Sequence, residues 1–258
     1  MELGLKDKKV LITGGSKGIG LACARAFMGE GARIAIVSRS QDNLNQAKKA
    51  LGNAYTIAAD LIDSAAAAAM VERVEKEFGP IDVLVNSAGA AKRTNADDLT
   101  PAAWRAAMDA KYFTYINVID PLVKRMAARG SGVIVNIIGA GGKLASPIHL
   151  PGGSANAALM LATAGLANAY AAKGVRVVGI NPGLTNTSRV SEGLKADAKR
   201  EGISEDEALA RAVRKLPLGR LAEPGEIADI AVFAASARGQ FLTGANISAD
   251  GVSTPTVV

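Results

Sequence analysis

Residues 9–20 read KVLITGGSKGIG, a mostly apolar run that leads into a glycine-rich turn. The turn continues directly into the apolar stretch that follows Gly20. A strand, a glycine turn and a helix in this order let a ligand approach the backbone closely, and the free N–H groups at the helix start favour negative charge. The segment therefore predicts a binding site for the pyrophosphate of a dinucleotide.

The rest of the chain repeats this alternation of short apolar runs with Ala-rich amphipathic stretches. The pattern is typical of a doubly wound α/β fold, in which a parallel sheet of about seven strands carries helices on both faces. We expect one Rossmann-type domain over residues 1–258. The predicted strands are Lys9–Thr13, Arg33–Ser38, Ala54–Ala59, Val83–Asn86, Val133–Ile138, Val175–Ile180 and Asn246–Ser248. The predicted helices are Gly18–Gly29, Gln41–Leu51, Ser64–Phe78, Thr100–Ala128, Ser154–Ala172 and Pro224–Ala235.

One stretch departs from the alternation. Residues 184–216 are charged and poor in strand-forming residues, and a Pro-Gly or Pro-Leu-Gly sequence borders them on each side. We expect a helical insertion here that acts as a lid and contributes to a substrate pocket.

Composition excludes several classes of protein. Of the 258 residues 49% are apolar and 21% are charged, so the chain can bury a core and is not disordered. The net charge of +6 is spread along the chain, which argues against a nucleic-acid partner. Cys23 is the only cysteine, so we expect neither an internal disulfide nor a metal site. The charged N-terminus and the lack of an apolar run of about 18 residues predict a cytoplasmic protein without a signal peptide or membrane span.

The end of the second predicted strand indicates which dinucleotide binds. It reads VSRS over residues 37–40, with no acidic residue to bind both ribose hydroxyls of NAD. Arg39, together with Lys17 in the first loop, would instead meet a 2′-phosphate. We therefore expect NADP(H) in preference to NAD(H).

Further short segments stand next to predicted strands and helices: Asp60-Leu61, Asn86-Ser87-Ala88-Gly89, Pro182-Gly183 with Thr187, Pro217-Leu218-Gly219-Arg220, Pro224 with Glu226, and Thr243-Gly244 with Asp250-Gly251. With Thr13–Gly20 they resemble the motifs of the short-chain dehydrogenases/reductases over essentially the whole chain. The resemblance implies that Asp60 lies by the adenine and that the segment Pro182–Thr187 holds the nicotinamide amide. The expected cofactor-binding residues are Gly14, Ser16, Lys17, Gly18, Ile19, Gly20, Ser38, Arg39, Asp60, Leu61, Asn86, Ala88, Gly89, Pro182, Gly183 and Thr187.

The resemblance also implies where catalytic residues would stand. The family uses an Asn, a Ser, a Tyr and a Lys, and its spacing puts these positions at Lys111, Gly139, Gly152 and Asn156, so that all four family side chains are missing. In the family the Asn and the Lys face each other across a water. Lys111 and Asn156 have therefore either exchanged an amine and an amide, or they are an exposed lysine and a tolerated helix residue.

Several other groups are candidates for moving a proton. His149 precedes the vacant Tyr position by three residues, in a loop expected to rim the cleft, and an ordinary histidine pKa near 6.5 suits proton transfer. A desolvated Lys111 would have a lowered pKa. Tyr115 stands four residues after Lys111 and can share its helix face, although packing explains it as well. Ser154 can supply a hydroxyl, although it can also cap its helix.

Two functions fit these observations. The first is an NADP(H)-dependent oxidoreductase that acts on a carbonyl or alcohol with a rearranged site, in which Lys111, His149 and Asn156 are the catalytic candidates. The alternative is a catalytically inactive NADP(H)-binding protein with a structural or redox-sensing role. We expect a small-molecule substrate in the first case, and in both a homotetramer, or else a dimer, formed through the helices Thr100–Ala128 and Ser154–Ala172.

Overall fold

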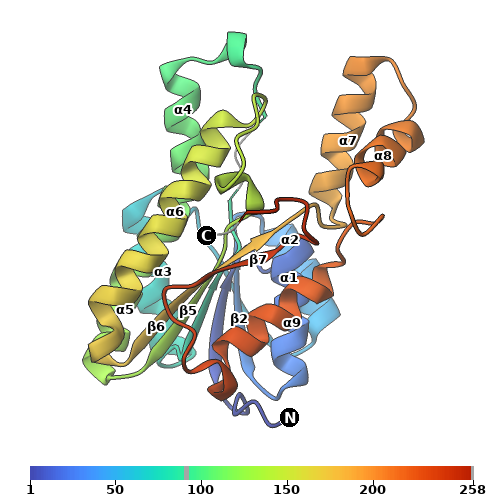
Figure 1. Cartoon of the computed structure of the whole chain (residues 1–258). Helices are drawn as coiled ribbons and strands as arrows, with labels where there is room; N and C mark the ends of the chain where they lie inside the picture. The colour runs from blue at the N-terminus through green and yellow to red at the C-terminus, as the bar shows by residue number, and fades with distance from the viewer. Residues whose placement is uncertain (90–92, 257–258) are drawn as a thin grey trace.

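Seven parallel strands form one continuous sheet in the computed structural model, which describes residues 1–89 and 93–256 (Figure 1). The sheet order is β3-β2-β1-β4-β5-β6-β7. The strands are β1 (Lys9–Thr13), β2 (Arg33–Ser38), β3 (Ala54–Ala58), β4 (Val83–Asn86), β5 (Gly132–Ile137), β6 (Val175–Pro182) and β7 (Asn246–Ala249). The predicted doubly wound parallel sheet is confirmed, with differences of one or two residues at some strand ends.

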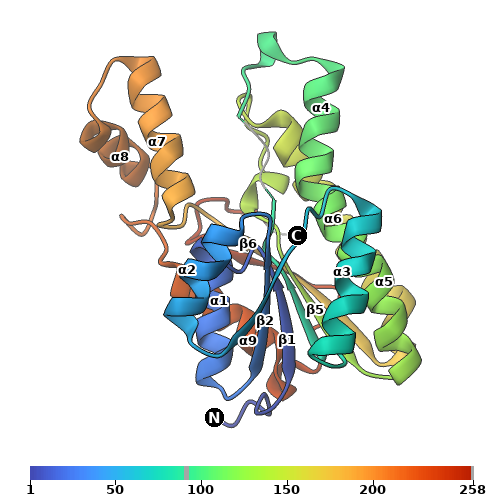
Figure 2. The same cartoon turned by 180° about the vertical axis from the view of Figure 1, so that it is seen from behind.

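Helices cover both faces of the sheet. They are α1 (Gly18–Gly29), α2 (Gln41–Leu51), α3 (Ser64–Glu77), α4 (Pro101–Ala107), α5 (Thr114–Arg129), α6 (Leu150–Tyr170), α7 (Ser188–Glu201), α8 (Glu205–Arg214) and α9 (Pro224–Ala235). One core cluster joins α1, α2 and α9 to one face, and a second joins α3, α5 and α6 to the other (Figures 1 and 2). Because both faces are covered, Val10, Leu11 and Ile12 of β1 are each 0% exposed, as the continuous apolar runs predict.

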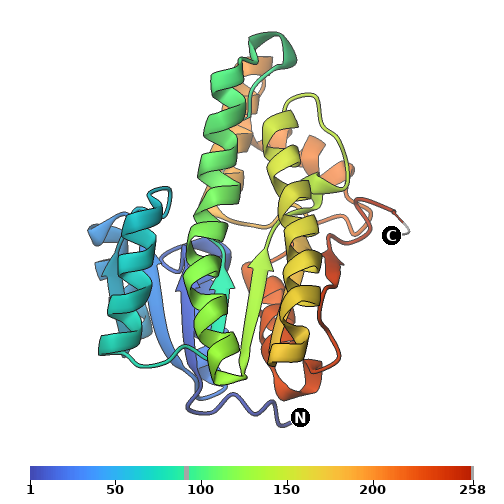
Figure 3. The same cartoon turned by 90° about the vertical axis from the view of Figure 1, so that its left-hand side faces the viewer.

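The helix predicted over Thr100–Ala128 is wrong in one respect, because it is not one regular helix. A π-helical segment, Met108–Phe113, separates α4 from α5. Figure 3 shows the resulting column of helix rising past the sheet between α3 and α6. A π turn adds a residue to the helical turn and is frequent at functional sites, and here it contains Lys111.

The predicted start of α6 is also wrong. The helix begins at Leu150 rather than at Ser154, with Pro151 in its first turn, where the missing N–H of proline costs nothing. Ala155, Leu159, Thr163 and Ala167, each four residues apart, form its buried stripe. Ser154 therefore does not cap the helix, and Gly152 lies inside its first turn.

The strand order reverses between β1 and β4, which is where open α/β sheets bind ligands beyond the carboxyl ends of their strands. At this edge α4 and the first turns of α6 project on one side, and α7 with α8 on the other (Figure 1). The helices α7 and α8 confirm the helical character predicted for residues 184–216. No helix within the described ranges has the length and apolar character needed to cross a bilayer.

Candidate functional site

The loop between β1 and α1 is packed so closely that it requires glycine. A Cβ on Gly14 would lie 2.9 Å from the Ala88 backbone, and one on Gly20 would lie 2.3 Å from the Gly14 carbonyl oxygen. Helix α1 starts without a side-chain cap on Lys17 and without an acidic residue in its first turn. Its first N–H groups are thus left for an anion from outside the helix, and the loop fits a pyrophosphate.

A cavity of about 540 Å³ extends from this loop along the carboxyl ends of β1 to β6. The predicted cofactor residues on its wall are Gly14, Lys17, Gly18, Ile19, Ser38, Arg39, Asp60, Leu61, Ala88, Gly89, Pro182, Gly183 and Thr187. Residues that the sequence did not single out also line it, among them Thr114, Ile137, Thr185 and Arg189. One continuous space therefore joins the glycine loop to the segment around Lys111.

Three predicted cofactor residues lie behind the wall. Ser16 is 8% exposed, and Gly20 packs against the Gly14 carbonyl. Asn86 belongs to a row of hydrogen bonds that runs through the sheet: the Thr13 hydroxyl donates to Asn86, Asn86 donates to Asn136, and Asn136 donates to the Thr163 hydroxyl, at 3.2, 3.0 and 3.0 Å. Thr13 Oγ1 also accepts the N–H groups of Ser87 and Ala88. Asn136 and Asn86 thus have structural roles, while Ser87 lines the cavity.

Charges divide the cavity into two ends. At one end, the exposed cations Lys17, in the loop after β1, and Arg39, directly after β2, share the wall with Asp60, which follows β3. Asp60 accepts the Ile62 N–H at 3.1 Å. Neither cation forms an ion pair with a carboxylate in the part of the chain that the structure describes. Both are available to a phosphate at this end.

The other end contains a buried amine. Lys111 is 8% exposed, and its Nζ donates to the Tyr115 hydroxyl at 2.8 Å and to the Ile137 carbonyl at 3.1 Å. The Tyr115 hydroxyl in turn donates to the Ile137 carbonyl. Burial, and then the charge of Arg189, lower the pKa of Lys111 from 10.5 to about 7. Lys111 is therefore not an exposed helix lysine, and near neutral pH it can both give and take a proton.

Tyr115 does share the face of Lys111, as its spacing allowed, and it is also 0% exposed within the core. Burial raises the pKa of Tyr115 far above the neutral range. Its hydroxyl therefore stays protonated and holds the Lys111 amine in place.

Gly139 lies two residues after β5, on the cavity wall, and has a φ of 128°. A Cβ at this position would lie 3.2 Å from the Asn156 side-chain nitrogen. Asn156 is 7% exposed, and its Oδ1 accepts no hydrogen bond from the described residues. The structure thus brings Gly139 and Asn156 together, as their expected positions require.

His149 stands immediately before α6, and its backbone N–H donates to the Ser146 carbonyl at 2.9 Å. Its ring lies near Asn156, because a Cβ on Gly141 would be 3.4 Å from His149 Cδ2 and 3.7 Å from Asn156 Nδ2. Burial lowers the pKa of His149, and the charges of Arg93, Arg189 and Lys111 lower it further. The ring is neutral at pH 7, so the ordinary histidine pKa assumed from sequence does not apply.

Helix α7 brings an arginine to the same end. Thr187 caps α7, and its Cγ2 would lie 3.2 Å from a Cβ on Gly18. Two residues later Arg189 lines the cavity and donates to the Gly89 carbonyl at 3.2 Å. Sequence analysis missed Arg189 because one cation in a charged segment has no distinguishing pattern.

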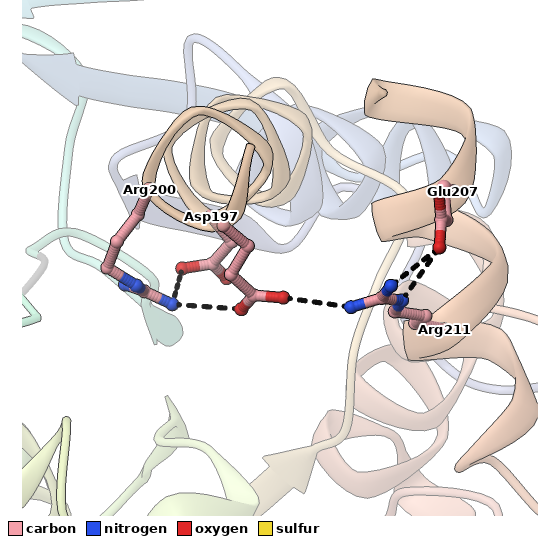
Figure 4. A network of polar contacts seen from close by, with 5 residues as sticks. Asp197, Arg200, Glu207 and Arg211 are labelled. Atoms are coloured by element: carbon pink, nitrogen blue, oxygen red, sulfur yellow. Dashed lines mark hydrogen bonds and ion pairs between the residues drawn. The ribbon is translucent and has the colours of Figure 1, made fainter. Parts of the chain in front are cut away.

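Ion pairs hold α7 and α8 beside the cavity. Asp197 of α7 binds Arg93 at 2.9 Å and Arg200 at 2.8 Å. Arg211 of α8 binds Glu201 and Glu207 (Figure 4). Since Arg93 and Asp197 are 104 positions apart, their pair ties α7 to the loop that follows β4.

This chain is similar to known proteins in both sequence and fold. The family model described as short chain dehydrogenase matches residues 8–198. Acetoacetyl-CoA reductase of Shinella zoogloeoides is 34% identical over 95% of this chain and 98% of its own, and 3alpha-hydroxysteroid dehydrogenase of Mediterraneibacter gnavus is 31% identical over 96% and 98%. The crystal structure of L-sorbose reductase from Gluconobacter frateurii, complexed with NADPH and L-sorbose, has a TM-score of 0.93 and 30% identity over the whole of both chains.

Proposed function

This chain belongs to the short-chain dehydrogenase family, and we propose that it is an NADP(H)-dependent oxidoreductase that interconverts a carbonyl and an alcohol at a rearranged site. The observation that carries the proposal is the single cavity that joins the glycine loop to the buried Lys111 amine. The bound nicotinamide supplies the hydride. The residues of this chain have to hold the nucleotide, orient the carbonyl and move one proton.

The preference for NADP(H) rests on the cations at one end of the cavity. Lys17 and Arg39 both reach its wall, and neither is neutralised by a described carboxylate, so a 2′-phosphate would gain charge-assisted hydrogen bonds there. Two structural relatives support the proposal because they are described with NADPH: L-sorbose reductase and an actinorhodin polyketide ketoreductase. Ser38 lies beside Arg39 on the wall and would contact the adenosine ribose.

The rearrangement concerns the proton donor. Family spacing puts Lys111, Gly139, Gly152 and Asn156 at the positions of the family's Asn, Ser, Tyr and Lys. Gly139 and Gly152 have no side chain to offer, whereas Lys111 is buried beside the cavity with a pKa of about 7. We assign Lys111 as the catalytic acid for reduction, giving a proton from Nζ to the carbonyl oxygen, and as the base for oxidation.

Asn156 and His149 would support this step without being acids. The Asn156 amide lies beside Gly139 with an unpaired Oδ1, and His149 has an unpaired Nδ1 among the described residues. Asn156 Oδ1 is an acceptor that a water or a substrate hydroxyl would satisfy, and His149 Nδ1 would donate or accept according to the tautomer of the ring. Helix α7, tied to the loop after β4 by Arg93 and Asp197, would act as the lid.

The alternative, an inactive NADP(H)-binding protein with a structural or redox-sensing role, has one observation in its favour. The Lys111 amine already donates to Tyr115 and Ile137, so it can be read as an internal support of the π segment between α4 and α5. This alternative predicts nucleotide binding without turnover.

Two measurements distinguish the oxidoreductase from the inactive NADP(H)-binding protein. Fluorescence titration with NADPH and NADH measures binding, and NADPH depletion over a panel of aldehydes, ketones and quinones measures turnover. We expect turnover that Lys111→Met reduces at least about 100-fold, in line with the loss of a general acid, while NADPH affinity and the activity of the exposed control Lys49→Met stay at wild-type level. Tight NADPH binding without turnover of any compound, or turnover that Lys111→Met leaves unchanged, would rule out the assigned role.

The oligomer and its location stay predictions. Helix α6 exposes Leu161 (77% exposed) on the side away from its buried stripe, and Phe113 at the end of the π segment is 42% exposed. Apolar side chains on these two elements support our proposal of a homotetramer, or else a dimer. We also retain the prediction of a cytoplasmic protein.

A further inference from the structure

The end of the cavity beside Lys111 has cations and no acid. Lys111 and Arg189 line it, and the only carboxylate on the whole described wall is Asp60, beyond β3. Charge of one sign in a concave site raises the local concentration of ligands of the opposite sign. The feature to explain is therefore an unbalanced positive charge where the reacting part of a substrate would lie.

Arg189 is the origin of most of this imbalance. Arg93 and Arg200 line a separate cavity, and both are paired with Asp197. Arg189 forms no ion pair with a carboxylate within residues 1–89 and 93–256. Its contact is with the Gly89 carbonyl, which uses one of the five N–H donors of a guanidinium and does not neutralise its charge.

Arg189 and Thr187 contact different segments of the cavity wall. Thr187 faces Gly18 of the pyrophosphate loop. Arg189, the second residue of α7, donates instead to the carbonyl of Gly89 in the segment that follows β4. Its charge acts there on Lys111, Tyr115 and His149. An anion bound by Arg189 would thus lie where its charge also acts on Lys111.

We propose that the substrate is a carbonyl or hydroxy compound with a carboxylate, and that Arg189 binds this carboxylate at the Lys111 end of the cavity. The inference rests on the proposed function and deepens it by naming the substrate class. Arg189 is a specificity-determining residue in this scheme, since a guanidinium binds a carboxylate through two parallel hydrogen bonds.

The carboxylate would also act on the proton donor. Arg189 disfavours the charged form of Lys111, so an anion that offsets Arg189 favours protonation of the amine. The other groups that act here are Tyr115 from α5, which stays protonated, His149 from the loop before α6, Arg93 from the loop after β4, and Glu192 of α7, whose charge acts on Arg189 without forming an ion pair with it. Substrate binding above pH 7 should therefore take up a proton at Lys111 Nζ, which is the proton that reduction consumes.

The test uses pairs of carbonyl compounds that differ only in charge: benzoylformate with benzoylformamide, levulinate with levulinamide, and 4-carboxybenzaldehyde with 4-carbamoylbenzaldehyde. Calorimetry measures their affinities for the full chain saturated with NADP⁺. The bound NADP⁺ keeps the test carboxylates out of the cofactor phosphate sites, and the measurement needs no turnover. The variants are Arg189→Met, Arg189→Lys and, as a matched control, Arg214→Met, which lies in the last turn of α8. Circular dichroism confirms that each variant is folded.

We expect at least one carboxylate to bind about tenfold or more tightly than its amide, as a hydrogen bond to a charged group allows. Arg189→Met should bring the ratio to about one, Arg189→Lys should keep part of it, and Arg214→Met should keep all of it. Calorimetry at pH 8 in buffers of different ionisation heat should show proton uptake in the wild type and none in Arg189→Met.

Two results would overturn the inference: equal affinities within every pair, or a carboxylate preference that Arg189→Met leaves intact. These results differ from failure of the proposed function. Carboxylate binding that depends on Arg189 without any turnover would support the anion site and remove the oxidoreductase. Turnover of neutral carbonyls only, without a carboxylate preference, would support the oxidoreductase and rule out the anion site. If NADP⁺ does not bind, the same pairs are measured on the free chain and read in the same way.

Discussion

Replacing Lys111 with methionine should make the protein more stable at neutral pH, even though it removes two hydrogen bonds. In the unfolded chain the amine has its ordinary pKa of 10.5, and in the fold the pKa is about 7. A pKa that is lower in the folded state means that the unfolded state holds more protons between these two values, so stability rises with pH across this window. An ion-paired lysine has a raised pKa in the fold, so its contribution to stability falls as pH rises, which is the opposite dependence.

The magnitude follows from the same two values. One pH unit corresponds to about 1.4 kcal/mol, so the buried amine costs the fold about 4 kcal/mol at pH 7 and about 2 kcal/mol at pH 9. Methionine carries no charge and fits a similar volume, while the lost hydrogen bonds to Tyr115 and Ile137 are each worth about 1 kcal/mol. Lys111→Met should thus gain roughly 2 kcal/mol at pH 7 and close to nothing at pH 9.

Urea unfolding followed by circular dichroism at pH 6, 7, 8 and 9 measures this difference. All samples need the same protein concentration, because the free energy of unfolding of an oligomer depends on it. Lys49→Met, on the exposed side of α2, serves as the control and should follow the wild-type pH dependence. Parallel pH curves for Lys111→Met and the wild type would refute the reasoning, because they would show that Lys111 does not titrate differently in the fold.

Three further predictions concern the nucleotide and the oligomer. Arg39→Asp should shift the preference from NADPH towards NADH by about tenfold or more, as the loss of a charged hydrogen bond to the 2′-phosphate requires; an unchanged NADPH/NADH affinity ratio in fluorescence titration would contradict the phosphate role. Gly20→Ala should abolish NADPH binding or unfold the loop, because its Cβ would stand 2.3 Å from the Gly14 carbonyl oxygen, and isothermal titration with normal affinity would be inconsistent with the packing. If the proposed homotetramer forms through α6, Leu161→Glu should reduce it to smaller species in sedimentation velocity, and a wild type that sediments as a monomer at micromolar concentration would remove the oligomer prediction.

The sheet was predictable from sequence because its strands are buried on both faces. Runs such as Val10–Ile12 and Val83–Val85 are apolar without interruption, and the covered sheet accounts for this. The glycine turn was equally clear, since close packing at Gly14 and Gly20 leaves no room for a side chain. The local residue pattern was therefore enough to predict these elements, although the packing that requires the pattern comes from distant segments.

The beginnings of the helices around the candidate catalytic end were less predictable. Pro151 and Gly152 are typical of a loop, yet they form the first turn of α6, where proline is tolerated and tertiary packing outweighs the low helix propensity of glycine. The π segment at Met108–Phe113 has no local sequence signal, although it determines where Lys111 lies.

The electrostatics of the site depended on contacts between distant segments. The spacing of Lys111 and Tyr115 suggested a shared face, but the Ile137 carbonyl that binds both comes from β5. Arg189 was missed altogether, because its contact with Gly89 joins positions 100 apart. Likewise His149 had an ordinary pKa from sequence alone, and only its burial and three neighbouring cations change that.

The row of hydrogen-bonded side chains that runs from Thr13 through Asn86 and Asn136 to Thr163 affects which residues of the cavity can be exchanged. Each donor in it points the same way, and the row fastens the backbone at Ser87 and Ala88 to the interior of the sheet. Positions 139 and 152 take no part in it. Exchange or loss of the side chains at these two positions therefore leaves every hydrogen bond of the row in place, although the row ends on α6, the helix that carries Gly152 and Asn156.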